Sequence, residues 1–306
     1  MSITGGREVG VRTKRSTRLV LNLTIVAVGL VYALPLIWML STSLKPVEQT
    51  MTAPPTLLPS PVLDTPRYAL ENYVGSVDAE GKPVTRGVWT DPVVDFPLFL
   101  RNSILVAILS VSGMVVSSAI VAYGFARVRW RGRGVVFAVL LATMMIPFPV
   151  LMGPLYVLFK ELGWIGTFRP LWVPSWFAGA FNVFLLRQFY LTIPREIDEA
   201  ARIDGCSHWS TFVHVILPLS RPALAVVALL QFIAVWNDFL GPLVFLQRQD
   251  QFTLALGLAL YQSQGGNVPW NLLMAASVLV LSPVLIVFVI TQRTFVEGIA
   301  TQGLKE

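Results

Sequence analysis

The residues best suited to do chemistry lie together in one charged segment, residues 192–220. Pro194 suits the first turn of a helix, and the acidic side chains that follow suit the positive end of a helix dipole. Arg195 and Glu199 have the i, i+4 spacing of an ion pair. Gly205 stands where a helix commonly ends in the left-handed conformation. We therefore expect a short helix of about ten residues between Pro194 and Gly205.

One face of this short helix carries little bulk. Ile197, Ala200 and Ala201 follow one another at the i, i+3, i+4 spacing of a single helix face. The two alanines leave a small surface against which another protein can pack closely.

A second helix is expected after the short one. Ser207 is suited to cap its N-terminus, and Leu217-Pro218 should end it before the next apolar run. By periodicity alone, the two helices are best interpreted as a solvated, charged connector lying on a bilayer surface, because amphipathic surface helices are common. The apolar stripe of the second helix has the helical spacing i, i+3, i+4, i+7 and consists of Trp209, Phe212, Val213 and Ile216.

Further candidate residues, Trp236, Asn237 and Asp238, lie inside an apolar run. Polar groups at membrane depth are costly and often functional, and an acid and an amide beside an aromatic ring suit the hydroxyls and ring face of a sugar. The alternative is that they hydrogen-bond neighbouring helices. His208 and His214 are six positions apart with no third ligand nearby, so we expect neither a metal site nor a catalytic residue.

The composition indicates what kind of elements position these residues. Of 306 residues, 55% are hydrophobic and 13% are charged, and the mean hydropathy is +0.67. Because soluble domains carry about 25% charged residues, a soluble or a disordered chain is excluded. The net charge of +6 does not indicate nucleic-acid binding, since the basic residues form short clusters rather than one stripe. The single cysteine, Cys206, excludes an internal disulfide.

Six apolar runs are long enough to cross a membrane, which takes about 20 residues in a helix. Such continuous runs do not alternate as barrel strands do, and open sheets leave backbone groups unsatisfied in lipid. The sequence therefore predicts an all-α membrane protein with six transmembrane helices. The runs are 19–40, 102–126, 135–159, 170–191, 222–247 and 272–291.

The basic residues predict the orientation. With the N-terminus inside, inner segments hold 15 of the 23 Lys and Arg residues, so the positive-inside rule places both termini in the cytoplasm. A cleaved signal peptide over residues 1–40 is the alternative, but its apolar run is too long and no cleavage site follows. The expected organisation is a cytoplasmic tail at 1–18, a first span at 19–40, a proline-rich extracytoplasmic loop at 41–97, a core at 98–292 that includes 192–220 between the fourth and fifth spans, and a cytoplasmic tail at 293–306.

The charged segment resembles the EAA motif of the inner-membrane permeases of binding-protein-dependent ATP-binding-cassette importers. Residues 199–205 read Glu-Ala-Ala-Arg-Ile-Asp-Gly, as in the carbohydrate-uptake group, and Leu217-Pro218 follow in the expected order. Val215 replaces the usual isoleucine. Residues 43–45 and 70–73 resemble the outer loop of the maltose-type G subunit. Further similarity to the sugar-permease pattern lies in 101–104, 122–127, 146–148, 184–189, 236–239, 274–277 and 292–298.

The resemblance implies that this chain is the permease subunit of an ATP-driven sugar importer, multi-pass in the cell inner membrane. The implied partners are a cytoplasmic ATPase homodimer, a second homologous permease of six or more spans, an extracytoplasmic sugar-binding protein and membrane lipid. A coupling helix would dock on the ATPase through Glu199, Ala200, Ala201, Asp204, Gly205, Leu217 and Pro218, and Trp236, Asn237 and Asp238 would line the substrate pathway.

The sequence has no phosphate-binding loop of the type G-x-x-x-x-G-K-[ST]. The resemblance therefore implies that ATP and Mg are bound by the partner ATPase, and that this chain holds no cofactor and is not itself an enzyme. The alternatives are an importer of the same kind for a non-sugar solute and a stand-alone secondary transporter, a class in which internal repeats are typical. We find no internal repeat.

Overall fold

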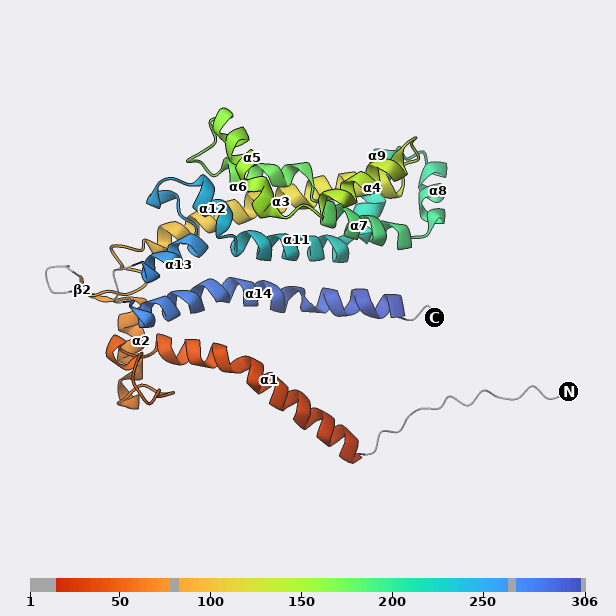
Figure 1. Cartoon of the computed structure of the whole chain (residues 1–306). Coiled ribbons are helices and arrows are strands. Elements are labelled where there is room, and N and C mark those ends of the chain that lie inside the picture. Colours follow the sequence, from red (N-terminus) through yellow and green to blue (C-terminus); the bar gives the residue numbers. More distant parts are fainter. Residues whose placement is uncertain (1–14, 78–82, 264–267, 304–306) are drawn as a thin grey trace.

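The computed structural model describes residues 15–77, 83–263 and 268–303. Within these ranges the chain is mostly helical (Figure 1), and the long helices are α1 (Arg15–Ser43), α3 (Phe96–Ala126), α11 (Arg221–Trp236) and α14 (Trp270–Gly303). Helix α3 packs against α11, α11 packs against α14, and α14 meets α1. Shorter helices lie along α3, while α1 diverges from the others (Figure 1).

The remaining elements are short. The segment between α1 and α3 contains α2 (Thr65–Tyr73) and the antiparallel strands β1 (Ser76–Val77) and β2 (Pro83–Thr85). The other α-helices are α4 (Arg133–Thr143), α5 (Phe148–Glu161), α6 (Arg169–Trp172), α7 (Ala180–Thr192), α8 (Arg195–Ile203), α9 (His208–Thr211), α10 (Leu217–Leu219), α12 (Leu240–Phe245) and α13 (Leu254–Gln262). Single turns of 3₁₀ or π type are η1 (Val47–Gln49), η2 (Val62–Asp64), η3 (Val173–Phe177), η4 (Phe212–Ile216) and η5 (Gln249–Gln251).

In the described part of the chain, three helices are long and apolar enough to cross a membrane: Leu19–Ser43, Phe96–Ala126 and Trp270–Gln292. Two bent pairs raise the number to five if each pair is one span. They are α4 with α5, bent by 98°, and His208–Leu219 with α11, bent by 77°. The prediction of a helical membrane protein is confirmed with three to five candidate spans. Six spans and cytoplasmic termini stay predictions.

Three of the expected runs are not continuous helices, and one of them, 222–247, is broken between α11 and α12. Run 135–159 is broken between α4 and α5, because a proline, Pro147, disfavours a helical conformation in the residue before it. Run 170–191 is divided among α6, η3 and α7, and Ala178 between η3 and α7 has a φ of 64°. Helix α7 has 13 residues, about 20 Å at 1.5 Å per residue. That is shorter than the hydrocarbon core of about 30 Å.

Polar side chains of α3 bind the backbone where other segments leave the helical conformation. The Ser117 hydroxyl accepts a hydrogen bond from the N–H of Ala178 at 3.0 Å. The Asn102 amide donates to the carbonyls of Asp250 and Phe252 at 2.9 and 3.0 Å. Because lipid offers no hydrogen-bond partner, these bonds allow irregular segments to lie against α3.

One of these segments, η3, approaches the α3 backbone closely at Gly113. A Cβ atom at this position would lie 2.3 Å from Cδ1 of Trp176, a distance that no real side chain tolerates. The Trp176 indole N–H donates to the carbonyl of Leu109 at 3.1 Å. Gly113 therefore permits the contact that seats η3 on α3.

Two apolar clusters lie along α3. The one toward α8 joins α3, α7, η4 and α11 through fully buried side chains that include Tyr190, Ile216 and Val227. The one toward α13 joins α3, α11, α13 and α14, and includes Phe99 and Tyr261. Burial of apolar area is the main favourable term wherever these helices meet away from lipid.

The segment between α1 and α3 is ordered around a buried amide, Asn72. Its Nδ2 donates to the carbonyls of Ser43 and Lys45, both at 2.8 Å, and its Oδ1 accepts from Nδ2 of Asn271 at 2.8 Å. One side chain thus joins the end of α1, helix α2 and the start of α14. This proline-rich segment therefore contains short ordered elements rather than loop alone.

The neighbouring Lys45 is almost fully buried. Its ammonium donates to the carbonyl of Thr56 and lies 4.7 Å from the centre of the Trp38 ring, an arrangement typical of a cation–π contact. Burial lowers the pKa of the ammonium, because the charged form is less well solvated there.

We predict that Asn72→Ala lowers the thermal unfolding midpoint of the detergent-purified protein. The change leaves two buried carbonyls and the Asn271 amide without their partner, and each such loss costs about 1–3 kcal/mol. Gln262→Ala is the matched control, because Gln262 is an exposed amide at the end of α13. Equal midpoints for the two variants would contradict this role of Asn72.

Candidate functional site

The short charged helix predicted after Pro194 is α8, Arg195–Ile203. Gly205 follows it with a φ of +81°, and the N–H of Cys206 donates to the carbonyl of Ala201 at 2.9 Å. This is the expected left-handed helix end, which glycine adopts without steric cost. The expected ion pair between Arg195 and Glu199 is absent from the part of the chain that the structure describes.

The surface of α8 separates the predicted docking residues into two groups. Glu199, Ala200, Asp204 and Gly205 are exposed, whereas Ala201 is only 7% exposed and faces the protein. A single exposed alanine between acidic side chains therefore forms the small outer face. Ala201 lies on the buried face of α8, which is turned toward the rest of the protein.

The second predicted helix begins as expected and ends later. The Ser207 hydroxyl caps α9 by accepting from the N–H of Ser210 at 3.2 Å. The chain continues through η4 and α10, so Leu217 and Pro218 lie within α10, and the bend into α11 comes at Ser220. Leu217 packs against the apolar cluster and Pro218 is exposed.

Arg127, at the end of α3, connects α8 to α3 and α7 through an ion pair and two hydrogen bonds. Its Nη1 lies 2.6 Å from Oδ2 of Asp198, and both side chains are largely buried, at 5% and 14% exposure. Its Nη2 donates to the carbonyls of Tyr190 and Ile193 at 2.5 and 2.6 Å. These carbonyls belong to the last turn of α7, where a helix has no donors of its own. The sequence patterns included Arg127 among the basic residues that predict orientation and in the similarity at 122–127, but they predicted no contact with α8.

A polar cavity of about 420 Å³ opens beside this ion pair. Its walls come from the end of α3, from α8 and from the start of α9. The charged side chains that line it are Arg127, Arg129, Arg195, Asp198, Glu199 and Arg202. The described surface around α8 therefore carries both signs of charge.

The predicted group Trp236, Asn237 and Asp238 does not form one site. Trp236 is buried against α14, and its indole N–H donates to the carbonyl of Val280 at 3.0 Å. Asn237 is exposed and donates back to its own helix, to the carbonyl of Ile233 at 2.8 Å. Consecutive residues at a helix end point about 100° apart, so the three side chains face different surroundings.

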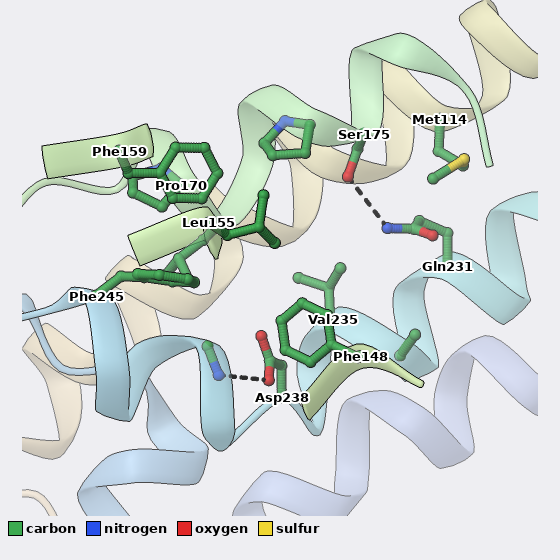
Figure 2. A pocket seen from close by; sticks show the side chains of 14 residues that line it. Met114, Phe148, Leu155, Phe159, Pro170, Ser175, Gln231, Val235, Asp238 and Phe245 are labelled. Atoms are coloured by element: carbon green, nitrogen blue, oxygen red, sulfur yellow. Dashed lines mark hydrogen bonds between the residues drawn. The ribbon is translucent and has the colours of Figure 1, made fainter. Parts of the chain in front are cut away.

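Asp238 lines a cavity of about 510 Å³ between α5, η3, α11 and α12 (Figure 2). Its Oδ1 accepts from the N–H of Gly241 at 3.0 Å. Two turns earlier on the same side of the cavity, Gln231 of α11 donates to the hydroxyls of Ser110 and Ser175 at 2.9 and 3.4 Å, and these hydroxyls are 2.6 Å apart. The remaining lining is apolar and includes Met114, Phe148, Leu155, Phe159, Val235 and Phe245.

This cavity has the chemistry of a site for an uncharged polar molecule. A carboxylate, an amide and a hydroxyl are its polar groups, and no Lys, Arg or His is among the described residues that line it. Sequence reasoning missed Gln231 and Ser175. The signal was present for Gln231, an amide inside an apolar run, whereas nothing in the sequence distinguishes Ser175 from other serines.

The chain is similar to known transport proteins over most of its length. It is 33% identical over 290 residues to the trehalose/maltose transport system permease protein MalG of Thermococcus litoralis, covering 94% of this chain and 97% of that protein. It is also 33% identical to the arabinooligosaccharides transport system permease protein AraQ of Halalkalibacterium halodurans, covering 91% and 93%.

Among solved structures, the fold matches a chain of a bacterial ABC transporter involved in the import of the acidic polysaccharide alginate. The TM-score is 0.72 at 22% identity, covering 92% of this chain and 98% of that one. Residues 114–300, which include α8 and most of the cavity lining, match a family model described as the binding-protein-dependent transport system inner membrane component. The chain belongs to that family.

Proposed function

We propose that this chain is the transmembrane permease subunit of an ATP-driven ABC importer that translocates a sugar delivered by an extracytoplasmic binding protein. The observation that carries the proposal is α8, a short exposed helix held by a buried ion pair. It occurs in a chain whose relatives over nine tenths of its length are named as sugar permeases.

Helix α8 acts as the coupling helix, and a cytoplasmic ATPase homodimer binds its outer face. Ala200 permits close approach, and Glu199 and Asp204 pair with cations of the ATPase. Gly205 permits the sharp exit of the chain toward α9. ATP and Mg belong to the ATPase, so this chain works as a transport subunit rather than an enzyme.

The arrangement of the helices supports the predicted orientation. Helix α8 and the C-terminal end of α14 lie at one end of the molecule, and α2 and β2 lie at the other (Figure 1). With the positive-inside rule, the α8 end faces the cytoplasm and the α2 end faces the binding protein. The apolar side chains of α1 are exposed along most of the helix, which suits contact with lipid and with a second permease.

The cavity at Asp238 is the part of the substrate pathway that this chain contributes. Sugar hydroxyls donate to the Asp238 carboxylate and exchange hydrogen bonds with Gln231 and Ser175, while the apolar walls contact the ring faces. The alternatives expected from the sequence were an importer of the same kind for a non-sugar solute and a stand-alone secondary transporter, and the relatives favour the sugar importer over both. Uptake by the reconstituted complex over a sugar panel, with and without ATP, separates them: uptake without ATP by this chain alone would contradict the proposal.

We predict that Ala200→Asp abolishes ATP-driven uptake by the reconstituted complex. The new charge is desolvated at the ATPase contact, which costs on the order of several kcal/mol, and the ATPase no longer copurifies with the permease. Ala200→Ser is the control, because it adds one small neutral group and should retain uptake. Unchanged uptake and ATPase binding by Ala200→Asp would refute the docking role of α8.

We predict that Asp238→Asn slows sugar uptake roughly tenfold without affecting assembly. The variant keeps an acceptor for the N–H of Gly241 but removes the charge, and a hydrogen bond to a charged group contributes about 1.5–3 kcal/mol. Asn237→Ala is the matched control, since its side chain bonds only to its own helix among the described contacts. The pathway assignment is wrong if both variants transport at the same rate.

A further inference from the structure

Helix α3 is attached to α8 by a buried contact at one end. Arg127, the C-cap residue of α3, pairs with Asp198 of α8 at 2.6 Å and holds two carbonyls at the end of α7. The same guanidinium thus joins three elements. Nε of Arg127 and Oδ1 of Asp198 are buried without a hydrogen-bond partner, so this contact is the main compensation for burying the two charges.

A second contact holds the next element to α3 one turn earlier. The Tyr123 hydroxyl donates to the carbonyl of His208, at the start of α9, at 3.1 Å. The Tyr123 ring also packs against Phe212 with the ring centres 4.9 Å apart. The segments on both sides of the α8–α9 turn are therefore bound to the last two turns of α3.

The other attachment of α3 lies at the cavity. The Ser110 hydroxyl contacts Ser175 of η3 at 2.6 Å and accepts from Gln231 of α11 at 2.9 Å. Ser110 and Arg127 belong to one unbroken helix and are separated by about 26 Å at 1.5 Å per residue. No proline interrupts α3 between these positions, so the helix has no hinge of that kind there.

We propose that α3 is the rigid element that carries the movement of α8 to the cavity, and that the ion pair of Arg127 with Asp198 makes α8 move with it. This inference rests on the proposed function and adds the route of coupling. Arg127 is a positioning residue, because its side chain is only 5% exposed and acts through Asp198 of α8. If the pair is broken, α8 can still dock on the ATPase, but its displacement no longer moves Ser110 and the groups bonded to it.

The functional test uses the complete reconstituted importer with Arg127→Met, Asp198→Asn and the double variant. Each single variant should keep the ATPase bound but transport at least tenfold less sugar per ATP hydrolysed. The double variant should be no worse than Arg127→Met, because both changes remove the same contact. Asp198→Glu, which keeps the charge, should recover part of the coupling. Arg129→Met is the control, since Arg129 is exposed beside the pair.

A spectroscopic test does not depend on transport. Spin labels at Ile108→Cys on α3 and Ile203→Cys on α8, with Cys206→Ser to remove the native thiol, report the distance between two exposed positions. The distance distribution should be narrow in the otherwise unchanged protein and clearly broader with Arg127→Met, but not with Arg129→Met.

The outcomes separate the two proposals. Absence of ATP-driven uptake for every sugar by the unaltered complex would overturn the proposed function and leave the spectroscopic result standing. An unchanged distance distribution and an unchanged amount of sugar per ATP in Arg127→Met would overturn the coupling route through α3. An equal loss of sugar transported per ATP in the Arg129→Met control would also overturn it, because the loss would then follow from removing any positive charge near α8.

Discussion

The structure depends on one constraint: a polypeptide in lipid must satisfy its backbone polar groups within the protein. Continuous helices such as α1 and α14 do so along their length. The chain leaves the helical conformation around Ala178, after Trp236 and between α12 and α13. In the described structure each of these breaks meets a polar side chain that supplies a hydrogen bond.

Most of these side chains come from α3. Ser117 binds the N–H of Ala178, Ser103 binds the N–H of Leu254, and Asn102 binds the two carbonyls just before α13. At the break after Trp236, the hydrogen bond comes from within the segment itself, because Asp238 accepts from the N–H of Gly241. Helix α3 therefore serves as the frame on which the irregular segments are built. The cavity forms where those segments separate, and the same helix ends at Arg127 against α8.

The parts of the fold that follow from local patterns were predictable from sequence. The long apolar runs at 19–40, 102–126 and 272–291 correspond to candidate spans, and the spacing of Pro194, the acids and Gly205 corresponds to α8. The contacts between residues distant in the chain were harder to predict. Arg127 and Asp198 are 71 positions apart, and no pattern within a single helix relates them.

The sequence by itself determined that this protein lies in a membrane, that it is mostly helical, and where α8 begins and ends, because apolar run length, charge placement and a left-handed glycine act over a few neighbouring residues. Only the tertiary structure decided which side chains share a site. In the folded chain, Trp236, Asn237 and Asp238 lie in three different surroundings. Asp238, Gln231 and Ser175 line one cavity. The reason is geometric: neighbours in a helix diverge by about 100°, whereas packing brings together residues that are distant in the chain.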